Sequence, residues 1–177
     1  MPQPHNRKRD VDKVVAIVRD AGGKLVGRTR LQKIGYLLER SGLGEGFPFE
    51  YRHYGPYSEE LASATRNAGL FGLLDEQEYP TSWGGLYSVF TTPAASSPDS
   101  ADQSRIDLIR EGADANPIEL ELAATAAFFA DQGSADPWQE TAKRKPQKAE
   151  GGRLDNAKVL YRRLQQIETP KPLPRIA

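Results

Sequence analysis

Apolar residues recur at helical spacing in two segments near the start of the chain. The first segment has them at i, i+3, i+4 and i+7, in Val11, Val14, Val15 and Val18. The second repeats the pattern with Leu31, Ile34, Leu37 and Leu38. Each pattern predicts a helix with one buried face. We expect these helices to end at Gly22-Gly23 and at Gly42, because glycine readily adopts the left-handed cap conformation.

Short local signals predict what surrounds the second helix. Residues 25–26 suggest a short strand before it. Thr29 followed three residues later by Gln32 is typical of a capping box, so we expect the helix to open there. The aromatic-rich segment 47–54 predicts an extended strand, and Gly55-Pro56 predicts a turn after it.

A third helix and a β-hairpin are expected next. Ser58 is a natural N-cap, with acidic residues in the first turn where the helix dipole favours them. We expect this helix to run to about Asn67 and to end at Gly69. Within residues 71–92, Gly84-Gly85 precedes an alternating segment, which is typical of a hairpin with one packed face. The fold class predicted is mainly α, with a winged-helix-like three-helix unit and a small β-hairpin wing over residues 8–92.

The second half of the chain predicts a C-terminal helical extension. Residues 93–103 are rich in Pro, Ser, Ala and Asp and favour a linker. Residues 104–168 predict helices that pack on the first unit, with Asn116 and Pro117 opening an alanine-rich helix to about Asp131. Further helices are expected from Asp136-Pro137 and over residues 153–167. The tail, residues 169–177, is expected to be extended or disordered.

Charge, cysteine count and residue spacing determine which partners, metals and cofactors we expect for the chain. Residues 1–42 carry ten basic and four acidic side chains, residues 43–81 two and seven, residues 92–136 two and nine, and residues 137–177 ten and four. The basic ends and acidic middle favour an interaction surface or charge pairing within the fold. The chain has no cysteine, and no His or Asp spacing indicates a metal site. We expect no cofactor and a cytoplasmic location.

The second helix and the segment after it hold the candidate partner-binding residues. These are Gln32, Lys33, Tyr36, Tyr54, Gly55, Pro56 and Tyr57. One hypothesis is that they form a polar groove that recognises a partner. The other is that Gln32 and Tyr36 bind the Gly-Pro turn by hydrogen bonds and hold the fold together. The sequence leaves both open, but either predicts that the two segments lie close together.

Possible nucleic-acid contacts are basic residues around the second and third helices. They are Arg28, Arg30, Lys33 and Arg66. In a DNA-reading winged helix the third helix enters the major groove, and here it carries Glu59 and Glu60 against Arg66 alone. Two acids facing phosphates would repel DNA. We therefore expect a non-catalytic module that binds a protein partner, with a DNA-binding transcriptional regulator as the alternative and an enzyme less favoured than either.

Two segments resemble a known group of bacterial proteins. Residues 26–38 (VGRTRLQKIGYLL) and residues 51–61 (YRHYGPYSEEL) are similar to the two signature motifs of the YwgA-like proteins. Their Leu-Gln-Lys-x-x-Tyr and Tyr-Gly-Pro elements also resemble the related Panacea group, which includes SocA-like antitoxins and phage-associated proteins. The resemblance implies a partner-binding module, antitoxin-like or an accessory of phage defence, with a toxin or defence component as its partner.

Overall fold

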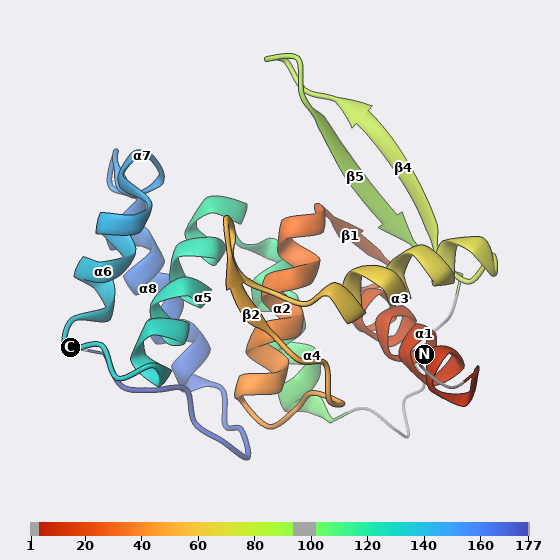
Figure 1. Ribbon diagram of the computed structural model, residues 1–177, viewed down its shortest axis with the longest axis horizontal. Coiled ribbons are helices and arrows are strands. Elements are labelled where there is room, and N and C mark those ends of the chain that lie inside the picture. The colour runs from red at the N-terminus through yellow and green to blue at the C-terminus, as the bar shows by residue number, and fades with distance from the viewer. Residues whose placement is uncertain (1–3, 94–101, 177) are drawn as a thin grey trace.

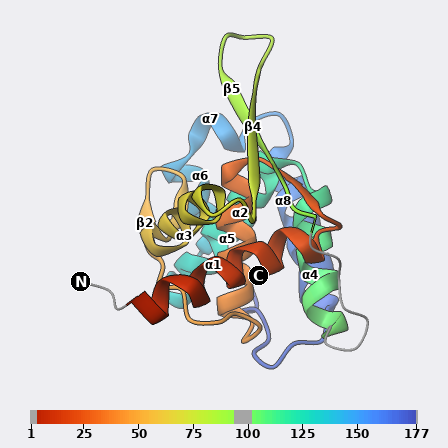
Figure 2. The same cartoon turned by 90° about the vertical axis from the view of Figure 1, so that its right-hand side faces the viewer.

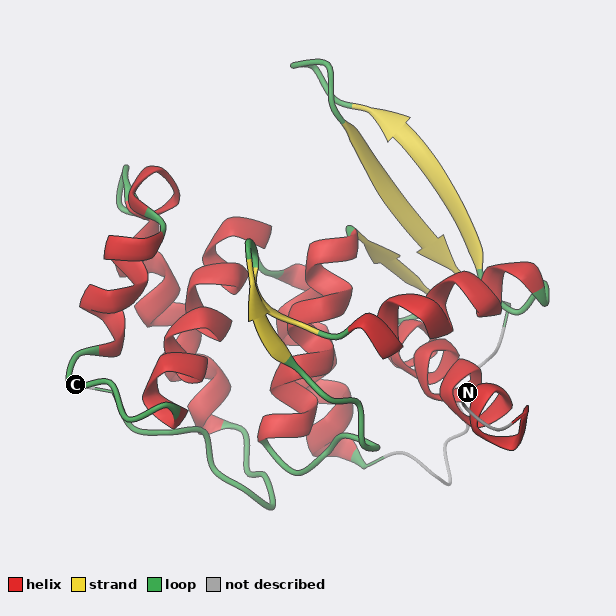
Figure 3. Cartoon of the chain, in the orientation of Figure 1, coloured by secondary structure: helices red, strands yellow, loops and turns green. Residues whose placement is uncertain are grey.

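Helices make up 57% of the computed structural model, which describes residues 4–93 and 102–176. Figure 3 shows a body of helices together with the strands of two small antiparallel sheets. The helices are α1 (Pro4–Asp20), α2 (Arg28–Arg40), α3 (Glu59–Leu70), α4 (Gln103–Asp114), α5 (Pro117–Asp131), α6 (Pro137–Arg144), α7 (Pro146–Ala149) and α8 (Arg153–Gln166). The strands are β1 (Lys24–Val26), β2 (Glu50–Arg52), β3 (Gly55–Tyr57), β4 (Asp75–Pro80) and β5 (Leu86–Thr91). The expected fold class is thus confirmed at the level of a mainly helical protein with a small sheet.

The larger sheet has the strand order β1-β5-β4. Leu25 of β1 lies opposite Phe90 of β5, and both side chains are buried. β4 and β5 form the expected hairpin, which we call the long hairpin, and it projects away from the helices (Figures 1 and 2). Its strands start later than expected because residues 71–74 turn out of α3 before the ladder begins.

Helix α2 occupies the centre of the molecule (Figure 1). All eight of its residues from Leu31 to Leu38 are buried, and α2 packs on both α4 and α5. Gly112 permits the approach of α4, because a Cβ there would fall 2.6 Å from Cγ1 of Ile34. One hydrophobic cluster includes side chains from both sides of the expected linker. Residues 94–101 of that linker lie outside the described residues.

Two helix starts are confirmed in detail. The side chain of Ser58 accepts a hydrogen bond from the backbone N–H of Leu61 at 3.1 Å. The side chain of Asn116 accepts one from the N–H of Ile118 at 2.9 Å, with Pro117 in the first turn of α5. Both caps satisfy amide groups that would otherwise have no partner at a helix end.

The predicted start of the second helix is wrong. Gly27, at φ 97°, is the N-cap of α2 and makes no side-chain cap bond, so Thr29 already lies inside the helix. The chain must turn sharply from β1 into α2, and this backbone conformation favours glycine. The side chain of Gln32, expected to bind the helix start, is instead bonded to Ser58.

The predicted Gly55-Pro56 turn is also wrong, and the tail, expected to be extended or disordered, has neither helix nor strand over residues 169–176. Gly55 and Pro56 belong to β3, and the chain reverses before them, between β2 and β3. In the tail, the hydroxyl of Tyr161 donates to the carbonyl of Pro174 at 2.5 Å, and Leu173 is buried. The tail is held because Leu173 belongs to the hydrophobic cluster of the core and the N–H of Lys171 donates to the carbonyl of Ser41, the residue after α2, at 2.9 Å.

Among the described residues, no helix combines the length and apolar character needed to cross a membrane.

Candidate functional site

Gln32 and Lys33 attach α2 to the segment that contains β3. The amide of Gln32 donates to the carbonyl of Ser58 at 3.0 Å and accepts from the N–H of Ser58 at 2.8 Å. Nζ of Lys33 donates to the carbonyl of Pro56 at 2.7 Å. The structure therefore brings together the two segments that carry the motifs, as expected, through contacts that bury both side chains.

Lys33 is an unusual residue because its amine is inside the protein. Only 1% of the residue is exposed. Burial lowers the pKa of Lys33 from its usual 10.5 to about 7, against the opposing influence of Glu121.

The backbone of Gly55 in β3 lies very close to α5: a Cβ there would fall 2.4 Å from Oγ1 of Thr125. Oγ1 of Thr125 has no hydrogen-bond partner in the part of the chain that the structure describes.

Lys33 belongs to a set of charged side chains that we call the buried cluster: Lys33, Glu121, Lys145 and Lys148. Glu121 accepts from Lys145 at 2.7 Å and from Lys148 at 2.8 Å. Lys145 also donates to the carbonyl of His53 at 3.0 Å. The last three members were not among the site residues predicted from the sequence. The one signal for them in the sequence is Glu121, a charge within the otherwise apolar stretch of α5.

Tyr36 makes contacts that differ from those of Gln32 and Lys33. Its hydroxyl donates to Asp131 at 3.3 Å, and Asp131 also pairs with Arg40 at 2.6 Å. Its ring packs on Phe49 and Phe128. Burial and the carboxylate of Asp131 raise the pKa of Tyr36. Tyr36 is therefore part of the core between α2 and α5. Its hydroxyl binds Asp131 of α5, whereas one hypothesis from the sequence was a hydrogen bond to the Gly-Pro turn.

The remaining candidates for partner binding differ in exposure. Gly55 and Pro56 are buried, and Tyr57 is half-buried beneath the guanidinium of Arg52 at 5.1 Å. Tyr54 is 60% exposed and lies under Nζ of Lys148 at 4.6 Å. The buried positions favour the hypothesis that this motif holds the fold together. A role in partner binding stays a prediction, centred on Tyr54 and Tyr57.

The candidate nucleic-acid contacts are all engaged within the protein. Arg28 pairs with Glu76 at 2.7 Å and with Glu78 at 3.1 Å. Arg66 pairs with Glu59 at 3.2 Å. Arg30 donates to two backbone carbonyls, each at 3.0 Å, and burial lowers its pKa. Lys33, the fourth candidate, is buried.

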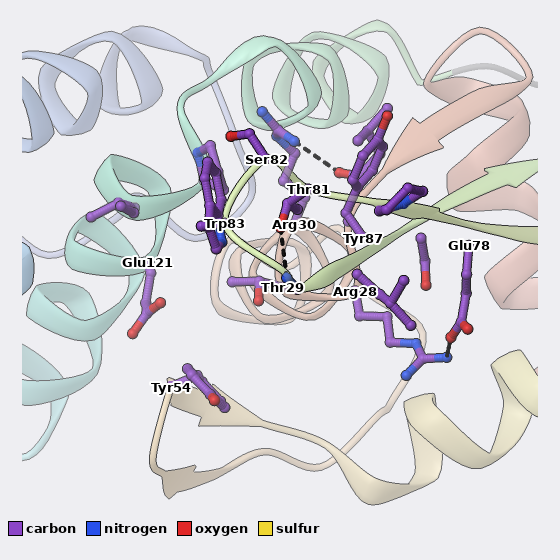
Figure 4. A pocket seen from close by; sticks show the side chains of 18 of the residues that line it. Arg28, Thr29, Arg30, Tyr54, Glu78, Thr81, Ser82, Trp83, Tyr87 and Glu121 are labelled. Atoms are coloured by element: carbon purple, nitrogen blue, oxygen red, sulfur yellow. Dashed lines mark hydrogen bonds and ion pairs between the residues drawn. The ribbon is translucent and has the colours of Figure 1, made fainter.

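A groove of about 960 Å³ lies between the long hairpin and the helical body. Its walls come from separate elements, and Figure 4 shows Trp83 at the turn of the long hairpin, Arg30 at the start of α2 and Tyr54 between β2 and β3. We call it the hairpin groove. Trp83 is 83% exposed and Leu86 is 66% exposed. Such exposed apolar side chains are typical of a surface that binds a partner.

A smaller cleft of about 210 Å³ lies between α3 and the sheet. It gathers four of the predicted residues: Arg28, Gln32, Tyr57 and Arg66. Because Arg28 and Arg66 already have carboxylate partners, the cleft offers little unpaired positive charge.

Comparison with protein-family models found no match, and comparison with curated proteins found none. Within residues 4–93 and 102–176, no three His, Asp or Glu side chains are grouped so that they could hold a metal ion.

Proposed function

We propose that this chain is a non-catalytic binding module that engages a protein partner through the long hairpin and the hairpin groove. The observation that carries the proposal is the exposed apolar surface of the hairpin. Trp83, Leu86, Tyr79 and Tyr87 are all exposed, and the last two rings stack at 5.6 Å. Rigid aromatic side chains of this kind supply much of the energy at protein interfaces.

The order of elements supports a winged-helix arrangement of the first unit. α1, β1, α2 and α3 precede the long hairpin, and β1 completes its sheet in the order β1-β5-β4. In this interpretation the long hairpin is the wing, and α3 occupies the place of a recognition helix. The resemblance to YwgA-like and Panacea proteins agrees with such a module. It favours an antitoxin-like role or an accessory role in phage defence.

DNA binding is the second candidate, and charge argues against it. Affinity for duplex DNA comes largely from Lys and Arg side chains that neutralise phosphates. Arg28 and Arg66 are already paired with carboxylates, and Glu59 and Glu60 occupy the first turn of α3. Binding DNA here would require breaking these ion pairs and placing acids beside phosphates. A protein partner has neither cost.

Catalysis has less support. The group with the most altered chemistry is Lys33, whose pKa is lowered to about 7. A general base must reach the proton that it removes. Lys33 is 1% exposed and its amine donates to the carbonyl of Pro56. These contacts suit a structural role.

The test is a comparison of two matched surface variants. The purified protein is used to isolate partners from extracts of its own cells, and each partner is then purified and titrated. Trp83→Ser should weaken binding at least about tenfold, which corresponds to 1.4 kcal/mol. Val159→Ser, which removes an exposed apolar side chain from α8, should leave the affinity unchanged. Equal binding by both variants would contradict the proposal.

A parallel titration with duplex DNA tests the alternative. If DNA is the ligand, affinity should fall on the order of a thousandfold between about 50 and 200 mM salt for six or more phosphate contacts. Tight binding with that salt dependence, unaffected by Trp83→Ser and abolished by replacing Arg28 and Arg30 with Ala, would favour the regulator instead.

A further inference from the structure

The outer strand of the larger sheet has an unpaired edge. β4 is hydrogen-bonded to β5 on one side and has no strand on the other, among the residues that the structure describes. Five of its six residues are exposed, and Glu76 is half-buried. Figure 1 shows β4 on the outer side of the long hairpin. An edge of this kind can accept an additional strand.

The register shows which backbone groups are available. The N–H of Thr81 donates to the carbonyl of Gly85 at 2.8 Å, so this is a hydrogen-bonded pair of the ladder. Because such pairs alternate along an antiparallel ladder, Gln77 and Tyr79 direct their N–H and C=O groups toward β5. Those of Glu76 and Glu78 point away from β5, toward the open edge. The edge therefore offers two complete donor and acceptor sets.

The same edge is acidic. β4 carries Asp75, Glu76 and Glu78 with no basic residue. Arg28 contacts both Glu76 and Glu78, so one positive charge is shared between two carboxylates. Like charges placed opposite one another destabilise a strand pair. Pairing between two copies of β4 is thus disfavoured, whereas a basic strand would be complementary.

We propose that the partner contributes an extended basic segment that adds to β4 as a fourth strand of the sheet. This inference rests on the proposed function, because it names the chemistry of the same kind of protein partner. Side chains of a strand alternate between two faces. On one face the added strand lies beside Glu76 and Glu78, and on the other beside Gln77 and Tyr79. The matching segment therefore carries Lys or Arg at alternate positions, with apolar residues between them.

A short peptide is the probe for this edge. A hexapeptide of alternating lysine and valine, with blocked ends, is titrated against the full chain while backbone amide exchange is followed by NMR. Exchange at Glu76 and Glu78 should slow at least tenfold, since these amides gain an acceptor. The amide of Tyr87, which faces β4 within the ladder, should change little. A glutamate–valine hexapeptide of the same length should not bind.

One variant separates the backbone contact from the charge. Glu78→Pro removes an outward N–H that β5 does not use, and proline is tolerated at strand edges. It should reduce the affinity for the lysine–valine peptide at least tenfold. Glu78→Gln, the matched control, removes the charge and keeps the backbone N–H, so it should lower the affinity for this peptide only about threefold.

Several outcomes would overturn the inference. One is that amide exchange at Glu76 and Glu78 does not slow at millimolar peptide. Another is that the two peptides bind equally well. A third is that Glu78→Pro and Glu78→Gln lose the same affinity for the lysine–valine peptide. Protection of the same amides that grows with protein concentration alone would assign the edge to a second copy. The proposed function fails separately, when Trp83→Ser retains full affinity for the isolated partner.

Discussion

The buried cluster and the long hairpin use their polar and apolar residues in opposite ways. In the buried cluster, Glu121 and Lys145 are withdrawn from water and paired with each other, and the amines of Lys33 and Lys145 donate to the backbone of the β2–β3 segment. On the long hairpin, aromatic side chains such as Trp83 are left in water. Buried charges are costly unless paired, and exposed aromatics gain nothing from the fold of this chain alone. The first region is thus explained by stability, whereas for the second we propose a partner as the explanation.

This contrast changes how the motif residues are interpreted. Gln32 and Lys33 stand out in sequence, yet both are buried and bonded to β3 or its end. Trp83 and Leu86 lie in a segment without a motif, and they line the hairpin groove. A distinctive motif here indicates a demanding junction within the fold, and the surface that we propose for recognition, the hairpin groove, lies next to it.

The largest effect is expected from removing the acid of the buried cluster. Glu121→Gln leaves Lys145 without its carboxylate partner, and breaking a buried ion pair in this way costs about 3 kcal/mol of unfolding free energy. Urea denaturation measures this loss. Glu119→Gln, two residues earlier in the first turn of α5, should change stability by less than about 0.5 kcal/mol. Equal effects of the two variants would show that the cluster does not stabilise the fold.

The next effect concerns the close approach of β3 to α5. Gly55→Ala should cost about 2 kcal/mol, because Gly55 has φ 83° and a Cβ would lie 2.4 Å from Oγ1 of Thr125. In a Thr125→Ala background the cost should fall by about 1 kcal/mol as the clash is relieved. A double-mutant cycle in urea measures this coupling. Strict additivity of the two changes would contradict the close approach.

The buried amine of Lys33 predicts a pH dependence of stability. The pKa of Lys33 is lowered from 10.5 to about 7 in the folded protein. Above about pH 7 the unfolded chain holds a proton on Lys33 that the folded protein has lost. The free energy of unfolding should therefore rise between about pH 7 and 9, by at most about 1.4 kcal/mol per pH unit. Denaturation of Lys33→Met should lack this rise, and an identical slope in both proteins would refute the assignment.

The smallest effect on stability is expected on the long hairpin. Trp83 is 83% exposed, so Trp83→Ser should change the free energy of unfolding by less than about 0.5 kcal/mol. Thermal or urea unfolding tests this expectation. A loss of several kcal/mol would mean that Trp83 supports the fold, and the contrast between the two regions would disappear.

Local patterns in the sequence determined the secondary structure well. The apolar spacing of α1 and α2, the caps Ser58 and Asn116, and the glycines before β5 each act within a few residues of the chain. For such features the cause and the effect are neighbours in sequence. The failures, at Thr29 and at Gly55-Pro56, occur where a distant contact takes over the groups on which the local pattern depended.

Only the tertiary structure decided the roles of the polar residues. Glu121 meets Lys145 and Lys148 from 24 and 27 residues away, and Lys33 meets Pro56 from 23. Likewise, the acids of β4 form an open edge only because β5 pairs with it on one side and β1 lies beyond β5. The sequence alone determined which residues are charged and which spacing is helical. Whether a charge is buried, paired or free to meet a partner depends on packing between segments far apart in the chain, because solvation and pairing are set by all the neighbours in space.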